Sequence, residues 1–402
     1  MSIACPVCRS GDLLEIIDLG EVPLFCNVQW STREEARRAA SAPMRLVGCT
    51  HCGHHFNAAF EPDRLQYAPA YDTSQHHSAT FRAYADALAA RLVENYHLRG
   101  KAVVDVGCGK GDLLKLICRL GGNRGYGFDV SYDGDPNPAD APGVTFRTTF
   151  FDAAQASDIE PALVCCRHVL EHVPDPVSFL RGLGAALDGR PDRVLYLEVP
   201  NGELQLTAGL LWDYIYEHYS YFSADSLRRA LQEAGFEVLR LAPAFGNQFL
   251  SAEVRLAAGP HAAGETAPAR AEEIDRQMRH AAGRFRALQG QWRDWAASLP
   301  RDPDSTVLWG AGSKGVTFVN LLGLSAPVPI DRMVDQNPNK HGRFVARTGQ
   351  VIASPLSLVG RTVRTVLLMN DIYREEITGW LRQHGVAAEL VSAMSAPTNP
   401  PA

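Results

Sequence analysis

A glycine-rich stretch in the first third of the chain carries residues whose types and spacing could hold a cofactor. The run Asp105-Val106-Gly107-Cys108-Gly109 follows an apolar segment, and its glycines let the backbone turn tightly and approach a ligand. Asp129 ends the next apolar run, at about the distance expected of an acid that accepts hydrogen bonds from ribose hydroxyls. The glycine spacing differs from the G-x-G-x-x-G of dinucleotide sites, so Asp105 suits a cofactor without phosphates. The stretch therefore favours S-adenosylmethionine.

Four of the nine cysteines form two CxxC pairs, a pattern typical of metal sites. The pairs Cys5-Pro6-Val7-Cys8 and Cys49-Thr50-His51-Cys52 can each place two thiolates on one ion, which completes a tetrahedral zinc site. Four protein ligands leave no position for an activated water, so the expected zinc is structural. Replacement of one ligand by a nearby histidine, His51, His54 or His55, stays open.

The length and charge of the chain limit the classes of function. A chain of 402 residues exceeds one ordinary core, so two or three domains are expected. The formal net charge is −6 and the basic residues are dispersed, so we expect no binding to nucleic acid or to a membrane surface. No apolar run reaches membrane-spanning length and the first residues lack a signal-peptide pattern, which predicts a soluble cytoplasmic enzyme that acts on a small molecule.

Strand patterns alternate with helical patterns, which predicts an α/β chain with a doubly wound parallel sheet. Such sheets bind ligands at the carboxyl ends of their strands, where the glycine turn after residues 102–106 lies. Apolar stripes at helical spacing predict a helix over 67–97 and a second helix over 269–299. The stripe of the second helix is expected to pack between domains.

A second strand, glycine turn and helix begins at Thr306, with the sequence GAGSKG over 310–315. Asp335 ends the next apolar run, as the acid of a dinucleotide site does. Lys314 and the polar run over 335–342 would fill the mouth of this turn, and they suit a phosphate-bearing substrate about as well. Both interpretations stay open.

Three motifs occur in the order CxxC with CxxC, DVGCGKGDLL, and GAGSKG with VDQNPNKHG. In this order they resemble the sugar C-methyltransferases of antibiotic and surface-polysaccharide biosynthesis, over nearly the whole chain. The resemblance implies a zinc domain, a class I methyltransferase domain that binds S-adenosylmethionine, and a Rossmann-like domain that helps to hold a nucleotide-linked keto-sugar. The implied regions are 1–66 (zinc-binding module), 67–258 (methyltransferase domain), 259–300 (linking helix) and 301–402 (Rossmann-like substrate-binding domain).

The resemblance also implies catalytic residues. In the family, the histidine of a Glu-His pair after the fifth strand is the general base, which gives His218 this role, with Glu217 as its orienting or proton-relaying neighbour. His172, which follows Glu171 after the fourth strand, matches a position beside the methyl acceptor. An aromatic core with a surface histidine, and a helix-capping role for His172, stay open as alternatives.

The tyrosines depart from the family register. Tyr214 and Tyr216 flank the expected position, and Tyr71 lies where the family supplies another substrate-facing tyrosine. The run Gly246-Asn247-Gln248-Phe249 replaces the family's His-Gly-Gly-Ser run, so the acceptor pocket need not be that of a typical deoxysugar. The expected cofactor contacts are Asp105, Gly107, Cys108, Gly109, Asp129, Asp152 and His168. The expected substrate contacts are Asn201, Lys314, Asn337 and Lys340.

We therefore expect a zinc-containing C-methyltransferase that uses S-adenosylmethionine and acts next to a carbonyl group. Carbon methylation at that position needs an enolate, and hence a base and a group that polarises the carbonyl. Three alternatives stay open: an O- or N-methyltransferase, an oxidoreductase that binds NAD at 310–315, and a non-catalytic zinc scaffold.

Overall fold

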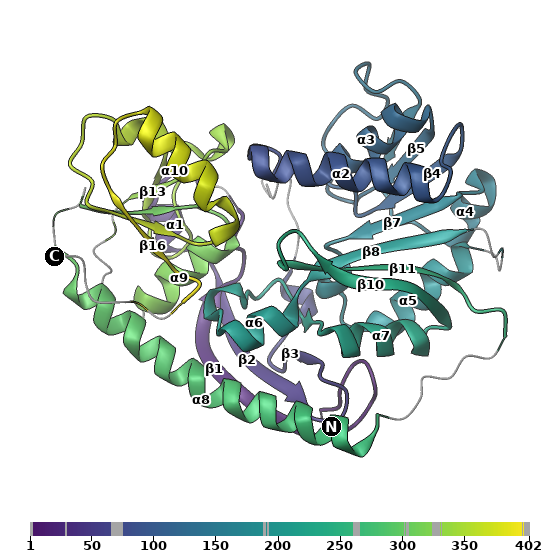
Figure 1. Cartoon of the computed structure of the whole chain (residues 1–402), viewed down its shortest axis with the longest axis horizontal. Helices are drawn as coiled ribbons and strands as arrows, with labels where there is room; N and C mark the ends of the chain where they lie inside the picture. The colour runs from purple at the N-terminus through teal and green to yellow at the C-terminus, as the bar shows by residue number, and fades with distance from the viewer. Residues whose placement is uncertain are drawn as a thin grey trace.

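Three β-sheets organise the protein, and one long helix runs along the first and the third of them (Figure 1). The computed structural model describes residues 3–28, 30–65, 75–187, 190, 193–259, 266–300, 302, 305–323, 330, 332–395 and 397. Among these residues, no helix is both long enough and apolar enough to cross a membrane.

The middle sheet has seven strands in the order β10-β11-β8-β7-β4-β5-β6, and it confirms the predicted doubly wound α/β fold. Neighbouring strands from β6 to β8 are parallel, and β11 is antiparallel to β8 and β10. All of β4 is buried, as expected of a strand that helices cover on both faces. The strands are β4 (Ala102–Val106), β5 (Arg124–Phe128), β6 (Val144–Arg147), β7 (Leu163–Arg167), β8 (Val194–Pro200), β10 (Phe236–Ala244) and β11 (Phe249–Leu256).

Helices cover both faces of this sheet because side chains alternate along each strand. Val103 points to the face covered by α2 and α3, where it joins Leu92 and Ile117. Val104 points to the face covered by α5 and α7, where it joins Leu180. The helices are α2 (Ala79–Asn95), α3 (Asp112–Gly121), α4 (Ala153–Ile159), α5 (Pro176–Ala186), α6 (Gly202–Ala208) and α7 (Ala224–Glu233), with the 3-10 turns η2 (Leu170–His172) and η3 (Leu211–Asp213).

The first sheet has the order β1-β2-β3-β9, and its last strand comes from a distant part of the sequence. β9 follows β8 along the chain, and it pairs with β3 through His55 opposite Tyr221 and Phe56 opposite Ser220. The sheet thus draws strands from both sides of residue 66, where a domain limit was expected. The elements are β1 (Leu13–Pro23), α1 (Arg33–Arg37), β2 (Ser41–Cys49), β3 (His55–Asn57), η1 (Pro62–Arg64) and β9 (Ser220–Tyr221).

The third sheet is parallel throughout, in the order β14-β13-β12-β15-β16. The strand and helix expected from Thr306 onward are β12 and α9, with Gly310 between them at a φ of 110°. The elements are β12 (Thr306–Trp309), α9 (Ser313–Gly323), β13 (Arg332–Val334), η4 (Pro338–Lys340), β14 (Val351–Ala353), η5 (Pro355–Leu358), β15 (Thr365–Leu368), η6 (Asp371–Tyr373), α10 (Arg374–Gln383) and β16 (Glu389–Ser392).

The long helix α8 (Pro268–Ser298) confirms the helix predicted over 269–299. It buries its apolar stripe in one core with residues of β1, β2 and α9. A Cβ at Gly48 of β2 would lie 2.5 Å from the sulfur of Met278, so the absence of a side chain lets the helix approach the sheet. The buried stripe consists of Ile274, Met278, Ala281, Phe285, Leu288 and Trp292.

Candidate active site

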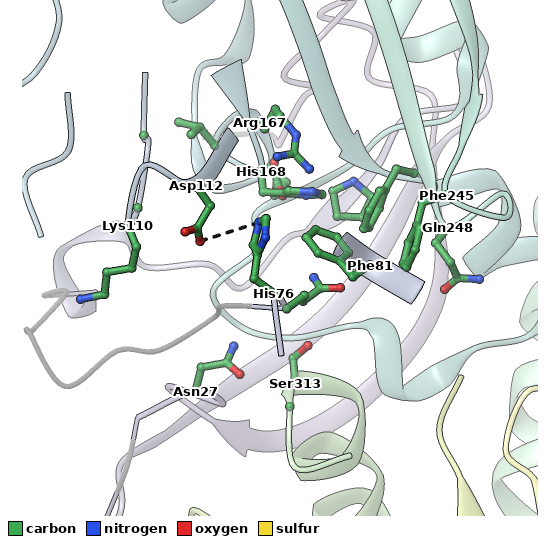
Figure 2. Close-up of a pocket in the computed structure, with 18 of the residues that line it drawn as sticks. Asn27, His76, Phe81, Lys110, Asp112, Arg167, His168, Phe245, Gln248 and Ser313 are labelled. Atoms are coloured by element: carbon green, nitrogen blue, oxygen red, sulfur yellow. Dashed lines mark ion pairs between the residues drawn. The ribbon is translucent and has the colours of Figure 1, made fainter. Parts of the chain in front are cut away.

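A cavity of about 880 Å³ lies at the carboxyl ends of β4, β5 and β7. Its lining comes from the turn after β4, from η2, and from the glycine turn after β12, so the two glycine turns open into one space. Figure 2 shows Asn27 and Ser313 on the opposite side of this cavity from Arg167 and His168. The position agrees with the ligand sites of open α/β sheets.

The glycines of the turn after β4 adopt left-handed backbone conformations, with φ of 67° at Gly107 and 54° at Gly109. A Cβ at Gly109 would meet no atom of the described residues within 4 Å, and Gly109 lines the cavity. A Cβ at Gly107 would lie 2.2 Å from Cγ2 of Val169. The sequence predicts ligand space at both glycines, and the structure has such space at Gly109, whereas Val169 fills it at Gly107.

Two expected cofactor carboxylates face this turn. Asp129 Oδ2 accepts the Gly109 N–H at 2.9 Å, and its Oδ1 accepts the Ser131 N–H at 2.8 Å. Asp105 is 5% exposed at the end of β4. Burial raises the pKa of Asp105 to about 7, against the lowering effect of Arg167. Both carboxylates line the cavity, so the turn presents a fixed acidic edge to it.

Two further expected cofactor contacts, Cys108 and Asp152, differ in their surroundings: the first lines the cavity and the second caps a helix. Cys108 lines the cavity, and burial raises the pKa of its thiol, which keeps the thiol protonated. Asp152 instead caps α4, where its Oδ1 accepts the Gln155 N–H at 2.9 Å, and it is absent from the described lining. Val130 and Phe150, which sequence analysis missed, line the cavity while 49% and 81% exposed. Their signal is their position just after the ends of β5 and β6.

His168 lies in the cavity wall between two buried carboxylates. Its Nδ1 is 3.4 Å from Glu171 Oε1, and its Nε2 is 3.2 Å from Glu198 Oε1. Burial lowers the pKa of His168, but the two carboxylates outweigh burial and raise it to about 9, so the imidazole is protonated at neutral pH. Its φ is 54°, a rare value outside glycine, which indicates that the surroundings hold this residue in place.

Glu198 of β8 holds His168 in place from the side of the middle sheet. Arg167 donates two hydrogen bonds to Glu198 Oε1, at 2.9 and 2.6 Å, and the hydroxyls of Tyr84 and Tyr196 donate to Oε2. Burial raises the pKa of Glu198, but Arg167 and these hydrogen bonds hold it well below its usual range. Glu198 is therefore a fixed anion beneath His168.

His172 and His218 lie side by side in the cavity wall, with ring centroids 4.8 Å apart in an edge-to-face arrangement. His172 Nδ1 is 2.8 Å from the carbonyl oxygen of Glu217; a carbonyl only accepts, so Nδ1 carries the proton. Burial lowers the pKa of His172, and burial together with His172 lowers the pKa of His218 to about 3. Both imidazoles are neutral at pH 7 and able to take a proton.

The side chains of Glu217, Tyr214 and Tyr216 lie apart from this pair. Glu217 Oε1 accepts the main-chain N–H of Cys26 at 3.1 Å. The hydroxyl of Tyr216 accepts a main-chain N–H at 2.8 Å, and Tyr214 is buried among aromatic rings. None of these three residues belongs to the cavity lining that the described residues form, so the structure does not bring them to the acceptor side. Tyr71 lies outside the described residues.

Two of the four expected substrate contacts line the cavity, and both are lysines of the third sheet's unit. Lys314 pairs with Asp213, and its Nζ is 3.3 Å from Gln248 Oε1. Lys340 Nζ donates to the carbonyl of Ala311 at 3.1 Å. Lys314 thus joins the glycine turn of the third sheet to the middle unit.

Asn201 and Asn337 have capping roles instead. Asn201 caps α6 by accepting the Leu204 N–H at 3.3 Å, and Asn337 accepts the Asn339 N–H at 3.0 Å at the start of η4. Neither belongs to the described lining of the cavity. Their expected role as substrate contacts is not supported by this arrangement.

Comparison with known protein families gives a match for the part of the chain around the middle sheet and another for the part around the third sheet. The family model described as a methyltransferase domain matches residues 75–241, and that described as a C-methyltransferase C-terminal domain matches residues 270–389. The chain is an S-adenosylmethionine-dependent methyltransferase. The second matched model is the one whose description names C-methyltransferases.

Several known proteins to which the chain is similar are named as methyltransferases. C-methyltransferase NovU of Streptomyces niveus is 27% identical over 392 residues, which cover 93% of this chain and 90% of NovU. A ubiquinone biosynthesis O-methyltransferase of Actinobacillus pleuropneumoniae serotype 7 is 35% identical over 118 residues, 27% of this chain and 49% of that protein. Among solved structures, magnesium protoporphyrin IX methyltransferase from Synechocystis matches 44% of this chain and 84% of its own, at 22% identity and a TM-score of 0.34.

The two CxxC pairs of the methyltransferase come together as four neighbouring sulfurs. The Sγ atoms of Cys5 and Cys52 are 3.6 Å apart, and those of Cys8 and Cys49 are 3.5 Å apart. Thiolates on a tetrahedral zinc, with bonds of about 2.3 Å, lie roughly 3.8 Å from each other. The donor set therefore fits a tetrahedral zinc ion.

Contacts between the middle and third units of the methyltransferase escaped sequence analysis. Glu376 of α10 accepts hydrogen bonds from the hydroxyls of Ser78 at 2.6 Å and Thr80 at 2.7 Å, at the start of α2. Asn370 donates to Gln248 Oε1 at 3.0 Å. Gln248 lies in the run that departs from the family pattern, which was a signal, whereas nothing near Glu376 in the sequence points to α2.

Proposed function

We propose that this methyltransferase transfers the methyl group of S-adenosylmethionine to a carbon next to a carbonyl, in a nucleotide-linked keto-sugar or a related metabolite. The observation that carries this proposal is the neutral pair His172 and His218, which faces the same cavity as the cofactor turn. The printed name of NovU, a C-methyltransferase, agrees with carbon as the methyl acceptor.

The cofactor side of the cavity supports the first half of this proposal. Asp129 would accept hydrogen bonds from the ribose, and Gly109 leaves room beside it. The exposed apolar side chains Val130 and Phe150 would cover the adenine ring. When bound, S-adenosylmethionine supplies an electrophilic methyl group.

The opposite side of the cavity supports a phosphate-bearing acceptor. The N-terminus of α9 follows the glycine turn at Gly310, and Ser313 and Lys314 of this helix line the cavity. Main-chain N–H groups at a helix N-terminus attract anions. We assign this end to the nucleotide diphosphate, and the end near His218 to the sugar.

The chemistry asked of the protein is removal of a proton from carbon. His218, held neutral by burial, would take the α-proton; the C–H electron pair would stay on the acceptor as an enolate, whose carbon bonds to the methyl group as S-adenosylhomocysteine leaves. Positioning of donor and acceptor in one cavity would lower the entropy cost of the step. The zinc that we assign to Cys5, Cys8, Cys49 and Cys52 would be structural, since the four thiolates fill its coordination sphere.

Product analysis tests this proposal. The enzyme is incubated with S-adenosylmethionine that carries a 13C-labelled methyl group and with a panel of nucleoside-diphosphate keto-sugars, and NMR shows which atom bears the label. We expect a carbon-bound methyl group, and we expect His218→Ala to lose about 10²–10⁴-fold of the turnover while its affinity for the cofactor is kept.

His280→Ala, a change on the exposed side of α8, is the control and should retain turnover. A label on oxygen or nitrogen would make the protein an O- or N-methyltransferase. Near-normal turnover of His218→Ala would remove His218 as the base.

A further inference from the structure

We infer that Glu171, rather than Glu217, is the carboxylate that balances the positive charge of His218 after proton transfer. This inference rests on the proposed function, because it needs a histidine that takes a proton from the acceptor. Glu171 would be a positioning residue, since it acts on the reaction through His218.

Glu171 has the burial and the position that this role requires. It is 1% exposed in η2 and belongs to the lining of the cavity. Both of its carboxylate oxygens are buried and have no hydrogen-bond partner among the described residues. One ligating atom each of Glu171, His172 and His218 lie within 4.8 Å of one another. A buried anion in this position would gain a hydrogen-bond partner, in addition to its ion pair with His168, when His218 becomes an imidazolium.

The carboxylate of Glu171 is also held from the other side. The protonated His168 lies 3.4 Å from Glu171 Oε1 and 3.2 Å from Glu198 Oε1. Glu198 is in turn fixed by the two hydrogen bonds from Arg167. This series of contacts leads from Glu171 through His168 to Glu198, which lies on β8. The position of the anion beside His218 therefore depends on the rigid sheet rather than on a loop.

Glu217 cannot replace Glu171 in this arrangement. Its carboxylate accepts the N–H of Cys26, and the described lining of the cavity contains His218 but not Glu217. What Glu217 offers to the histidine pair is its main-chain carbonyl, which accepts the proton of His172 Nδ1. Its side chain and its main chain therefore serve different neighbours.

The charges around His218 agree with the inference. His172 and His168 both lower its pKa, and Glu171 raises it; Tyr221 of β9 packs on its ring at 5.9 Å. Without Glu171, a new imidazolium here would be opposed by burial and by the neighbouring His172 and His168. The negative charge of Glu171 offsets part of the free energy that it costs to form an imidazolium in a buried site.

The same three side chains are also of types and spacing that could hold a divalent metal. The imidazolium of His168, 3.4 Å from Glu171, opposes this interpretation, because it would repel a second cation at close range. We therefore favour a carboxylate that serves as a counter-ion, and a metal at this position is an outcome of the test.

The test compares Glu171→Gln, Glu171→Asp and Glu217→Gln, with Glu253→Gln as a control for the loss of a buried carboxylate outside the cavity. The probe is a keto-sugar nucleotide that the wild type methylates. The readouts are kcat, KM, the pH profile of kcat/KM, and exchange of the α-proton with deuterium in the presence of S-adenosylhomocysteine.

We expect Glu171→Gln to lose about 10²-fold in kcat and in exchange, with KM and cofactor affinity little changed. The acid limb of its pH profile should move to lower pH, because loss of the anion lowers the pKa of His218, and a purely structural role would not move it. Glu171→Asp, which keeps the charge at a shorter reach, should recover part of the rate even where Glu171→Gln folds poorly. Glu253→Gln should keep the wild-type kcat.

Several results would overturn the inference. One is a wild-type exchange rate in Glu171→Gln, and another is a loss of kcat and a shifted profile in Glu217→Gln alone. A metal ion beyond zinc that is bound by the wild type and absent from Glu171→Gln would also overturn it. Failure of the proposed function is a separate result, since the wild type itself would then neither exchange the α-proton nor form a carbon-bound methyl group.

Discussion

Gly107 and Gly109 share a left-handed backbone conformation, yet their missing side chains face different surroundings. At Gly107 a Cβ would overlap Val169, and at Gly109 it would project into space that the described residues leave open. Gly107 is thus needed for the packing of the turn, whereas Gly109 leaves room for the cofactor that we propose.

This difference predicts two separable effects. Gly107→Ala should lower the free energy of unfolding by about 2–5 kcal/mol, because its Cβ overpacks against Val169 and its left-handed backbone adds strain. Gly109→Ala should cost about 1–2 kcal/mol in backbone strain and should weaken cofactor binding about tenfold or more, because its Cβ enters the cavity. Denaturant unfolding and titration calorimetry measure the two effects.

Gly100 supplies the matched control. It also has a positive φ and open space around its Cβ, but it is not part of the cavity lining. Gly100→Ala should therefore show the strain without the loss of affinity. If Gly109→Ala bound S-adenosylmethionine as tightly as the wild type, the cofactor would not occupy this side of the turn.

The glycine spacing pointed to the turn after β4, and the family resemblance pointed to His172 and His218; these residues line the cavity, whereas several of the expected polar contacts do not. Asp152 and Asn201 cap helices, and a capping oxygen and a ligand-binding oxygen look alike in a sequence. Glu171 and Glu217 each precede a histidine, and only the structure separates their surroundings.

At the scale of elements, β9 links the cysteine cluster to the histidine pair. The strand begins two residues after His218 and pairs with β3, which lies just beyond Cys52. The main-chain N–H of Asn57 also donates to the carbonyl of Tyr219 at 3.0 Å. Disorder in the first sheet would therefore reach the segment that holds His218.

Removal of zinc should for this reason affect turnover. A strong chelator, or Cys52→Ser, should reduce the zinc content from about one ion per chain to none, lower the melting temperature and abolish most turnover. Affinity for S-adenosylmethionine should change by less than about threefold, because the cofactor turn belongs to the middle sheet. Elemental analysis, thermal melts and calorimetry make the measurement.

Cys118→Ser, in a cysteine of α3 outside the cluster, should keep the metal. Full turnover of the zinc-free protein would show that β9 holds its place without the cluster.

Long elements with a clear period were predictable, and short pairings between distant segments were not. The apolar stripe of α8 repeats at the helical period, and β4 is a short apolar run before a glycine turn, so both can be read from the sequence. β9 has two residues, too few for any period, and its partner β3 lies far earlier in the chain. Its role depends on tertiary packing alone.

At the scale of the whole molecule, the cavity exists because the middle and third units meet. The carboxylate of Glu376 sits at the start of α2, and Lys314 pairs with Asp213 of η3. Both contacts are polar and specific, so they hold the two walls of the cavity in position and depend on the identity of the paired side chains.

Glu376 gives this contact a specific dependence on pH. Burial raises its pKa, but the hydrogen bonds from Ser78 and Thr80 outweigh burial and hold it below the usual value. A carboxylate with a lowered pKa in the folded state stabilises the fold above its unfolded pKa of about 4.3, and this stabilisation is lost as pH falls through the folded pKa. Glu376→Gln should therefore melt about 1–4 °C below the wild type at pH 7, and the two should converge below about pH 4.

Glu375→Gln, a change at the exposed neighbouring position, should melt like the wild type at every pH. A gap between Glu376→Gln and the wild type that persists at low pH would mean that the carboxylate acts by shape rather than by charge.

The pairing of β9 with β3 also limits how homologous enzymes can exchange parts. A chimera that takes residues 3–65 from a relative receives a foreign β3, while Ser220 and Tyr221 stay behind as its partner. The strand register and the aromatic contact between His55 and Tyr221 would then come from two lineages. A graft that preserves activity should move the segment around His218 together with the N-terminal region. The two segments must be exchanged together, although they lie far apart in the sequence.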